Sequence, residues 1–381
     1  MIKILFLIRD LGQGGAEKVL VNLVNNMDPQ KFDISVTALF GGGVNEQFLA
    51  PHIRFRSIWK HSFPGNSHLM KLLTPAQLHK LCVKEKYDIE VAYLEGPTAR
   101  VISGCSHGDT VLISWIHTEF PDRKALSAPF RSEKEALSCY KVFHQTVCVS
   151  RRVSERFQAL TQITQNVSVL YNTVESDKIL ALSQEELPSL SAVSCPKLIA
   201  VGTLKEVKGF DRLLRIIKRL VDEDYPLHLT LLGIGPLWDN LQQSITDLKL
   251  SQVVSMPGYD TNPYKYIRNS DLFVCSSHTE GFSTVATEAL IVGTPVCTVE
   301  VSGMKEMLGE HNEYGIITGN TEDALYEGIR SLLDNPALLD HYARQASIRG
   351  KAFQTKETVS AVEAMFTSLA SGDAYEPQEK N

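Results

Sequence analysis

Short runs of apolar and β-branched residues alternate along most of the chain with longer segments in which apolar residues recur every three or four positions. The short runs are typical of buried strands, and the longer segments are typical of helices that bury one face. In one such segment, Ala16, Val19, Leu20, Leu23 and Val24 share a helical face. We therefore expect helices that include Ala16–Val24 and Phe210–Val221, and strands at Ile2–Ile8, Ile34–Leu39, Ile89–Tyr93, Thr110–Ile116, Thr146–Val149, Val167–Leu170, Leu198–Val201, Leu227–Leu232, Val253–Met256, Leu272–Cys275 and Pro295–Val299.

The alternation of strands and helices occurs twice. Apolar strands that alternate with amphipathic helices are typical of parallel sheets covered by helices on both faces. A stretch that is poor in strand signals, Ser176–Pro196, separates the two halves and predicts a linker with a short helix. The sequence thus predicts an α/β protein with two Rossmann-like, doubly wound domains at 1–180 and 195–355, followed by a C-terminal helix and polar tail at 356–381.

The composition narrows the class of protein. The 381 residues are 43% hydrophobic and 22% charged, which excludes a disordered chain, a collagen-like fibre and a small disulfide scaffold. No stretch approaches the roughly 18 apolar residues that span a bilayer, and the apolar run at 2–8 is too short for a signal peptide. We therefore expect a cytoplasmic protein.

The seven cysteines are scattered and form no C-x-x-C pair. Cys148, Cys275 and Cys297 lie within apolar runs, which predicts small buried side chains. The acidic run Asp222-Glu223-Asp224 follows a helix and precedes Pro226, so we expect a solvated turn there. These patterns predict neither disulfides nor a required metal ion.

Charge is distributed unevenly between the two halves. Residues 1–176 hold 20 Lys and Arg against 16 Asp and Glu, whereas residues 177–381 hold 18 against 28. An anionic membrane surface or anionic acceptor is one explanation for the basic half, and scattered surface charge is the other. Nucleic acid is disfavoured, because no basic run is interleaved with aromatic residues.

A glycine-rich segment, Gly12-Gln13-Gly14-Gly15, follows the first expected strand and opens a helix. Main-chain N–H groups at such a helix start attract anions. The dinucleotide fingerprint G-x-G-x-x-G is not present, because Glu17 stands at its third glycine position. The segment is therefore either a phosphate-contacting loop of another kind or a tight turn.

The most informative segment is 276–290, between an expected strand and an expected helix. Glu280 falls in the loop at the carboxyl end of the strand, where open parallel sheets bind ligands. Residues 281–284 open the helix, and Glu288 lies on the same helical face as Thr284. Two carboxylates beside a donor-rich helix start suit a molecule with sugar hydroxyls on both sides of a pyrophosphate. A capping Glu and a solvated Glu are the structural alternative.

These residues resemble the signature of the retaining family-4 glycosyltransferases of the GT-B fold. The match comprises the Glu-x7-Glu pair Glu280 and Glu288 within Gly281-Phe282, Ala289, Gly293 and Pro295-Val296. Further motifs resemble the family in order along the chain: Gly14-Gly15-Ala16-Glu17, Asn172-Thr173-Val174-Glu175, Lys208-Gly209-Phe210-Asp211, Gly233-Ile234-Gly235-Pro236 and Pro257-Gly258-Tyr259. The resemblance extends over nearly the whole chain and implies two domains that face each other across a cleft.

The resemblance also implies roles for individual residues. Glu280 would bind the hydroxyls of the donor sugar, Glu288 the ribose, and Lys208 the diphosphate. His117, at the end of a strand in the first half, would lie near the transferred sugar, with Glu119 or Asp122 as its partner. The remaining implied donor contacts are Gly14, Gly15, Lys205, Gly258, Tyr259, Gly281, Phe282, Ser283, Thr284 and Val285. The family usually has an Arg where this chain has Thr203, and Lys205 is the candidate replacement.

The resemblance implies a retaining glycosyltransferase that acts in surface polysaccharide biosynthesis. It would move a sugar from a nucleotide-diphosphate sugar, with UDP favoured over GDP, to a hydroxyl of a glycan or lipid-linked oligosaccharide acceptor. No cofactor is expected, and the partners are the donor, the acceptor and peripherally the inner leaflet of the cytoplasmic membrane. A nucleotide-sugar 2-epimerase of the same fold and a catalytically silent nucleotide-sugar-binding protein are the alternatives.

Overall fold

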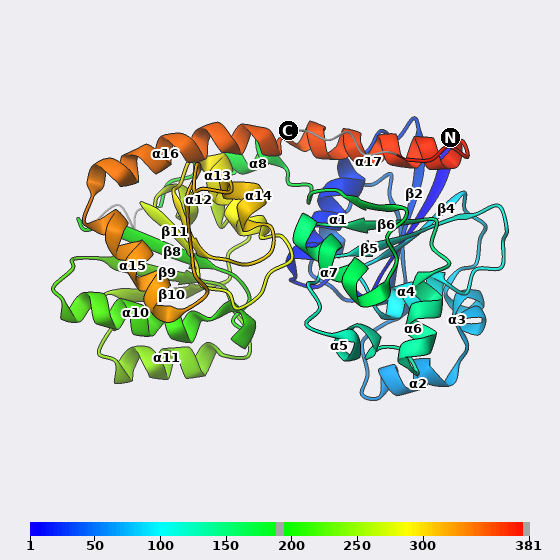
Figure 1. Ribbon diagram of the computed structural model, residues 1–381, viewed down its shortest axis with the longest axis horizontal. Helices are drawn as coiled ribbons and strands as arrows, with labels where there is room; N and C mark the ends of the chain where they lie inside the picture. The colour runs from blue at the N-terminus through cyan, green and yellow to red at the C-terminus, as the bar shows by residue number, and fades with distance from the viewer. Residues whose placement is uncertain (188–193, 376–381) are drawn as a thin grey trace. The chain divides into compact units, whose positions relative to one another are not determined.

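The computed structural model describes residues 1–187 and 194–375 and divides into two compact units (Figure 1). Unit 1 comprises Met1–Thr173 and Lys356–Asn381, and unit 2 comprises Val174–Thr355. The expected linker begins with a short helix, α8 (Ser176–Leu182), which belongs to unit 2. The rest of that segment includes 188–193, and the end of the expected tail includes 376–381; both lie outside the described residues.

Unit 1 is built on a seven-stranded parallel sheet with the order β3-β2-β1-β4-β5-β6-β7. The strands are β1 (Ile2–Ile8), β2 (Phe32–Phe40), β3 (Arg54–Trp59), β4 (Ile89–Tyr93), β5 (Val111–Ile116), β6 (Gln145–Cys148) and β7 (Val167–Val169). The helices include α1 (Gly15–Asn26), α2 (Asn66–Leu72), α3 (Pro75–Cys82), α4 (Pro97–Ile102), α5 (Arg123–Ser127), α6 (Glu133–Tyr140), α7 (Arg151–Thr161) and α17 (Thr355–Ala370).

The C-terminal helix α17 completes the core of unit 1. Phe366 is fully buried, and its ring lies edge-on to Phe6 and Phe32, with ring centroids 5.8 and 6.3 Å apart. The main-chain N–H of Asp28 donates to the Glu363 carboxylate at 2.7 Å. Burying a phenylalanine stabilises a fold by about 1.5–3 kcal/mol. The chain therefore leaves unit 1 after β7 and returns to it at its end.

Unit 2 contains a six-stranded parallel sheet with the order β10-β9-β8-β11-β12-β13. The strands are β8 (Lys197–Val201), β9 (His228–Leu232), β10 (Val254–Gly258), β11 (Leu272–Cys275), β12 (Val296–Val299) and β13 (Ile316–Thr318). The helices after α8 include α10 (Phe210–Asp222), α11 (Trp238–Asp247), α12 (Tyr264–Arg268), α13 (Thr284–Val292), α14 (Met304–Leu308), α15 (Glu322–Leu333) and α16 (Pro336–Gly350).

The expected fold class is confirmed, and each of the eleven expected strands corresponds to an observed one. The sequence pattern missed β3 and β13, which are the edge strands of their sheets. Neither contains a buried residue, so neither carries the apolar run by which the others were recognised. Cys148, Cys275 and Cys297 are buried, as their apolar surroundings predict.

Each sheet has a point at which the strand order reverses, between β1 and β4 in unit 1 and between β8 and β11 in unit 2. Open α/β sheets bind ligands outside the carboxyl ends of the strands at such a switch point, because the loops from its two strands diverge there. In unit 2, Lys208 follows β8 and Glu280 follows β11, the two strands at the switch point. In unit 1, Gly14 and Gly15 follow β1, whereas His117 follows β5, one strand beyond β4.

Candidate active site

In unit 2, the loop that follows β11 is held in place by a buried arginine. Arg212, on the first turn of α10, is 4% exposed. Its Nε donates to the main-chain oxygen of Ser276 at 2.7 Å, and its Nη2 donates to that of Ser277 at 2.8 Å. Its Nη1 reaches Asn320, whose amide donates in turn to the His278 oxygen. The guanidinium thus fixes the three residues that lead to Glu280.

The loop after β8 packs directly against this segment. Gly209 has a φ of +61°, and a Cβ at this position would lie 2.2 Å from the Ser276 oxygen. Glycine is therefore required both by the backbone conformation and by the close approach of the two loops. The Ser276 hydroxyl donates to the Lys208 oxygen at 2.9 Å, and the His278 N–H donates to Val207 at 2.7 Å. One side-chain and one main-chain hydrogen bond thus join the loops that follow β8 and β11.

Lys208 and Glu280 meet between these loops. The Lys208 ammonium donates to Glu280 Oε1 at 2.6 Å, and the Ser277 hydroxyl donates to the same oxygen at 2.6 Å. The two charged side chains are 27% and 12% exposed. Burial lowers the pKa of Lys208, but the neighbouring Glu280 charge outweighs it, so the pKa is raised overall. The ammonium therefore stays charged beside a partly desolvated carboxylate.

Helix α13 begins directly after Glu280. The Ser283 hydroxyl caps it by accepting a hydrogen bond from the Ala286 N–H at 3.3 Å. The first amides of a helix, here those of Thr284 and Val285, have no acceptor within it, and with the helix dipole they favour an anion. Glu288, one turn further, is 2% exposed. Gly281 and Phe282 lead into this cap, and the Phe282 ring is buried 6.3 Å from that of Phe353.

Glycine turns bring the ends of β8, β9 and β10 close together. A Cβ on Gly233, whose φ is +145°, would lie 2.0 Å from the Gly202 oxygen. Gly258 accepts from the Gly233 N–H at 2.8 Å, and Tyr259 beside it is 48% exposed. Thr203, where the related family usually has an Arg, lies on the same edge. Lys205 precedes the turn that carries Lys208 and is exposed.

In unit 1, the glycine segment ends at the start of α1. Gly14 is the N-cap residue with a φ of −70°, so its backbone conformation does not require glycine. The loop before it is anchored, because Asp10 accepts from the Gly12 N–H at 2.9 Å and the Asn45 amide donates to the Gly12 oxygen. Gly14 and Gly15 therefore present the first main-chain amides of a 12-residue helix at the carboxyl edge of β1.

His117 follows β5 and belongs to a cluster of buried polar side chains without hydrogen-bond partners. Its ring lies 4.7 Å from that of Tyr93, and the Tyr93 ring lies 5.2 Å from that of Trp115. These side chains are 9%, 0% and 3% exposed. Among the described residues, His117 Nε2, the Tyr93 hydroxyl and Trp115 Nε1 have no partner. Buried polar atoms are nearly always paired, so these three stand out as groups whose hydrogen-bonding capacity is unused within the part of the chain that the structure describes.

Burial determines the charge state of this cluster. It lowers the pKa of His117 to about 3, so the imidazole is neutral near pH 7. Burial also raises the pKa of Tyr93 well above its usual range, with a further contribution from the charge of Glu17 on the first turn of α1. The cluster can exchange hydrogen bonds with a sugar but carries no charge itself.

The expected carboxylate partners of His117 have other roles. Glu119 accepts from Arg152 Nε at 3.0 Å, and Asp122 caps α5 by accepting from the Ala125 N–H at 2.7 Å. The carboxylate that contacts His117 is that of Glu95, which accepts from its main-chain N–H at 2.9 Å. Glu95 follows the neighbouring strand β4, a proximity that spacing along the sequence does not reveal.

Sequence reasoning also missed Arg212, Ser277, Tyr93 and Trp115. Arg212 directly follows the Lys208-Gly209-Phe210-Asp211 motif, so its position in the sequence could have indicated a role beside the donor site. The others are ordinary polar or aromatic residues at strand ends, and only the fold shows their partners. Lys208 and Glu280, which the resemblance assigns to one donor site, are in direct contact although 72 residues separate them in sequence.

Two protein families have models that match the chain. Residues 13–178 match Glycosyltransferase Family 4, and residues 188–349 match Glycosyl transferases group 1. Together the two matches extend over most of both units.

The chain is also similar to individual glycosyltransferases and to a solved structure. The chain is 26% identical to the N-acetylgalactosamine-N,N'-diacetylbacillosaminyl-diphospho-undecaprenol 4-alpha-N-acetylgalactosaminyltransferase of Campylobacter jejuni, over 93% of this chain and 96% of that one. It is also 26% identical to the lipopolysaccharide core biosynthesis glycosyltransferase LpsE of Rhizobium meliloti, over 76% and 77%. Anabaena HepE, solved with UDP and glucose, superposes with a TM-score of 0.78 at 19% identity, covering 97% of this chain and all of that one.

No helix within residues 1–187 and 194–375 combines the length and the apolar character needed to cross a bilayer.

Proposed function

Because this chain belongs to the glycosyltransferases of group 1 and family 4 and has the GT-B fold, we propose that it is a retaining hexosyltransferase acting on a lipid-linked glycan. The donor is a nucleotide diphosphate sugar, UDP-linked in preference to GDP-linked, and the acceptor group is a hydroxyl. Two relatives support this choice: the name of one describes transfer to a diphospho-undecaprenol-linked sugar, and that of the other describes lipopolysaccharide core biosynthesis. HepE was solved with UDP and glucose.

The observation that carries the proposal is the contact between Lys208 and Glu280 beside the start of α13. An ammonium has three donors, so Lys208 can keep Glu280 while it binds a diphosphate oxygen. The amides of Thr284 and Val285 add donors for the same anion. Negative charge grows on the diphosphate as the sugar departs, and fixed positive groups stabilise that charge in the transition state.

The two carboxylates of unit 2 have separate tasks in this proposal. Glu280 uses its remaining acceptor capacity for hydroxyls of the transferred sugar, and Glu288 on α13 binds the hydroxyls of the ribose. Tyr259, which is half exposed beside Gly258, lies against the base. Lys205, exposed one turn before Lys208, supplies the second cation in place of the Arg absent at Thr203.

His117 acts by orienting the sugar. A neutral imidazole with an unpartnered Nε2 suits a hydrogen bond with a sugar hydroxyl, whereas it cannot act as an anionic nucleophile. The bond from C1 to the phosphate oxygen breaks while a bond from C1 to the acceptor oxygen forms on the same face. The acceptor proton passes to the departing phosphate oxygen, so no side-chain base is required and the anomeric configuration is retained.

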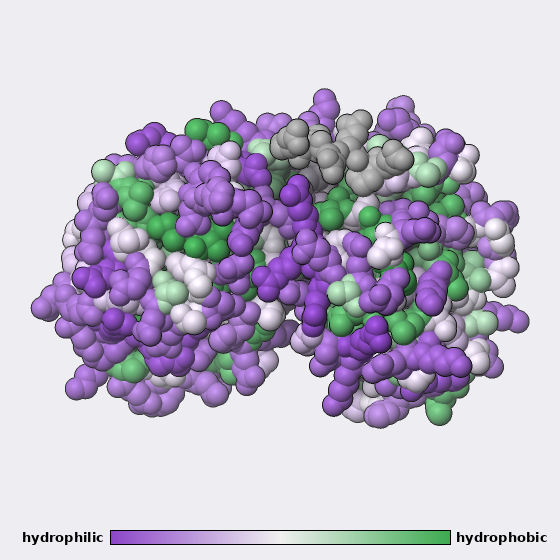
Figure 2. Space-filling model, viewed as in Figure 1, coloured by the Kyte–Doolittle hydropathy of each residue, from purple (hydrophilic) through white to green (hydrophobic). Residues whose placement is uncertain are grey.

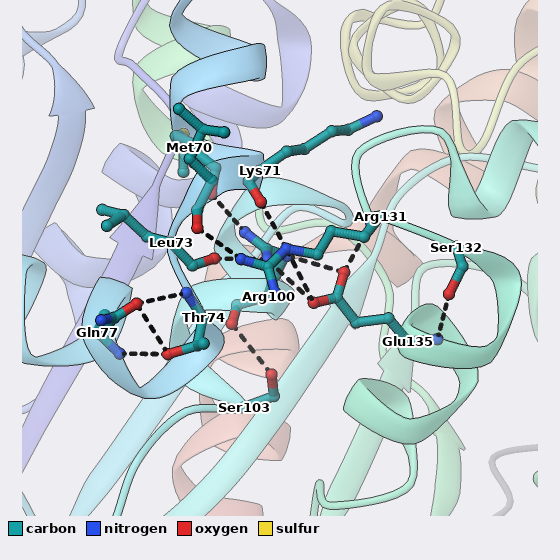
Figure 3. Close-up of polar contacts among 11 residues, drawn as sticks. Met70, Lys71, Leu73, Thr74, Gln77, Arg100, Ser103, Arg131, Ser132 and Glu135 are labelled. Atoms are coloured by element: carbon teal, nitrogen blue, oxygen red, sulfur yellow. Dashed lines mark hydrogen bonds and ion pairs between the residues drawn. The ribbon is translucent and has the colours of Figure 1, made fainter.

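The surface around α2 supports a peripheral contact with the membrane that holds the acceptor. Leu69 and Leu72 on α2 are 45% and 75% exposed. Figure 2, drawn in the same view as Figure 1, shows apolar residues among hydrophilic ones in the region of α2. Two arginines hold the end of this helix: Arg100 donates to the Met70 and Leu73 oxygens, and Arg131 donates to that of Lys71 (Figure 3). Arg131 also donates to the Leu72 oxygen at 2.6 Å. Exposed leucines beside cations suit an anionic lipid interface.

Not all of the basic residues of this half are free for such a role. Arg123 donates to the Leu160 oxygen, Arg156 to that of Phe120, and Arg152 to Glu119. These cations brace loops within unit 1, so the excess of basic residues is partly structural. The membrane contact therefore rests on α2 and not on the overall charge balance.

Vesicles containing anionic lipid should retain the wild-type chain and release the Leu69→Ser, Leu72→Ser double variant.

The proposal is tested by a thermal-shift screen of UDP, GDP and ADP, followed by transfer assays with the corresponding sugars on a polyprenyl-diphosphate-linked acceptor. A bound ligand raises stability by RT ln(1 + [L]/Kd), about 2.7 kcal/mol at a hundredfold excess over Kd. NMR of the product then gives the anomeric configuration. An epimerised sugar without acceptor identifies the 2-epimerase alternative, binding without turnover identifies the silent protein, and an inverted product contradicts retention.

A further inference from the structure

Three potential metal ligands converge in unit 1 on the face of the sheet opposite His117. They are His79 on α3, Glu90 on β4 and Cys105 in the loop between α4 and β5. Glu90 and Tyr93 lie three residues apart on one strand, so their side chains point to opposite faces. Glu90 is also near the amino end of β4, whereas Tyr93 is at its carboxyl end. Within unit 1, the cluster therefore lies apart from Tyr93 and from His117, whose ring contacts that of Tyr93.

The three groups are close together and mostly buried. His79 Nε2 lies 2.7 Å from Glu90 Oε2, and the Cys105 thiol donates to Glu90 Oε1 at 3.8 Å. One ligand atom from each residue lies within 4.8 Å of the others, and within 1–187 and 194–375 no other such group of His, Cys, Asp or Glu occurs. Glu90 is fully buried and His79 is 6% exposed. A carboxylate in such a place needs close compensation for its charge.

The surrounding chain holds the ligands in position. A Cβ on Gly104 would lie 2.1 Å from the main chain of Pro75, so glycine allows the Cys105 loop to touch the start of α3. A capping box between Thr74 and Gln77 fixes that start (Figure 3). On the other side, the Ser103 hydroxyl donates to the main-chain oxygen of Arg100 on α4. The elements that carry His79 and Cys105 are therefore anchored independently of any ligand.

We propose that His79, Glu90 and Cys105 form a structural site for a divalent transition-metal ion, which the ligand set identifies as Zn²⁺, with His107 as the fourth ligand. Mixed imidazole, carboxylate and thiolate donors suit zinc, whereas Mg²⁺ and Ca²⁺ prefer oxygen. His107 is exposed, and its ring centroid lies 6.4 Å from that of His79.

The charges of this site balance when the metal is bound. A thiolate and a carboxylate carry two negative charges, which one Zn²⁺ neutralises, while both imidazoles bind as neutral groups. The thiol proton is released to solvent on binding. The contact between His79 and Glu90 opens as the ion takes its place between them. The ion then joins α3, β4 and the 103–110 loop, and it takes no part in sugar transfer.

Cobalt binding to the full-length chain tests the site directly. Co²⁺ replaces Zn²⁺ in tetrahedral sites, and ligation by a thiolate gives a charge-transfer absorption in the near ultraviolet. We expect one equivalent of Co²⁺ to produce this band, and one equivalent of Zn²⁺ to abolish it. Cys105→Ser should remove the band, and His79→Gln should weaken metal affinity at least tenfold, the order lost when a ligand or its support is removed.

Cys195→Ser is the matched control, because Cys105 and Cys195 are the two cysteines of the chain that are not fully buried. This variant should keep the band and the stoichiometry of the wild type. Zn²⁺ at a hundredfold excess over Kd should raise the Tm of the wild-type chain by about 5–10 °C and leave that of Cys105→Ser unchanged. Absence of a cobalt band in the wild type, or its loss in Cys195→Ser but not in Cys105→Ser, overturns the proposal.

Discussion

Replacement of Lys208 by alanine is the most direct test of the donor site. The change removes the ammonium that contacts Glu280 at 2.6 Å and leaves the carboxylate with the Ser277 hydroxyl. Removing one fixed donor from a site of developing negative charge typically costs about 2.7–4 kcal/mol, or 10²–10³ in turnover. We therefore expect turnover to fall at least a hundredfold, with a smaller loss of affinity for the free nucleoside diphosphate.

The same change also affects stability, and its size follows from the exposure of the pair. Breaking a fully buried ion pair costs about 3–5 kcal/mol. Here the side chains are 27% and 12% exposed and Ser277 still compensates Glu280, so solvent screening reduces the expected loss to about 1–3 kcal/mol. For a unit of this size the Tm should fall by roughly 2–10 °C. Activity must therefore be measured well below that transition.

The assay is steady-state transfer from the preferred nucleotide sugar, with diphosphate affinity measured by calorimetry. Lys218→Ala is the matched control, because Lys218 forms an exposed ion pair with Asp222 on α10 and should be worth about 0–1 kcal/mol. It should retain wild-type turnover. A Lys208→Ala enzyme that transfers sugar within about threefold of the wild type would refute the assignment of Lys208 to the diphosphate.

Further predictions concern both units. His117→Gln should lower turnover at least tenfold with diphosphate affinity unchanged; wild-type turnover would contradict its role. Because burial depresses the pKa of His117 from 6.5 to about 3, the unfolded chain binds the extra proton first. Wild-type stability should therefore decline as pH falls from about 6.5 toward 3, and less steeply in His117→Gln, as acid titration monitored by fluorescence will show. Glu288→Ala should weaken binding of the free nucleoside diphosphate, whereas Glu280→Ala should spare it and reduce turnover; equal losses in calorimetry would contradict this division. Arg212→Met, which leaves the buried main-chain oxygens of Ser276 and Ser277 without their donor, should destabilise unit 2 by about 2–6 kcal/mol, since each unsatisfied buried acceptor costs about 1–3 kcal/mol; denaturant unfolding measures the loss.

The sequence predicted most of the fold because strand and helix periodicities are local properties. Ile2–Ile8, Ile89–Tyr93 and Leu272–Cys275 coincide with the observed strands, since each is a mostly apolar run with a sharp polar boundary, interrupted only by Lys3 and Glu90. The edge strand Arg54–Trp59 was missed, because Arg54 and Arg56 break the apolar pattern. The return of the chain to unit 1 at α17 was also beyond sequence patterns, because it depends on the contact of Phe366 with Phe6 and Phe32.

The candidate donor site was predictable to the extent that its residues occur in compact motifs. Glu280, the helix start and Glu288 lie within nine residues, so a strand and a helix suffice to place them relative to each other. The partner of His117 was not predictable in this way. Neighbouring acidic residues in sequence, Glu119 and Asp122, are used elsewhere, and Glu95 reaches the histidine from the adjacent strand.

The sequence by itself thus determined the two α/β halves, all strands except the edge strands β3 and β13, and the short motifs at the strand ends. Tertiary structure alone decided which of these motifs meet. Lys208 contacts Glu280 because β8 and β11 are adjacent although 72 residues separate the side chains. His79, Glu90 and Cys105 show no metal-binding spacing, and a helix, a strand and a loop bring them within 4.8 Å. Periodicity reports which face of an element is buried, but the pairing of parallel strands, set by packing over long separations, determines which side chains share a site.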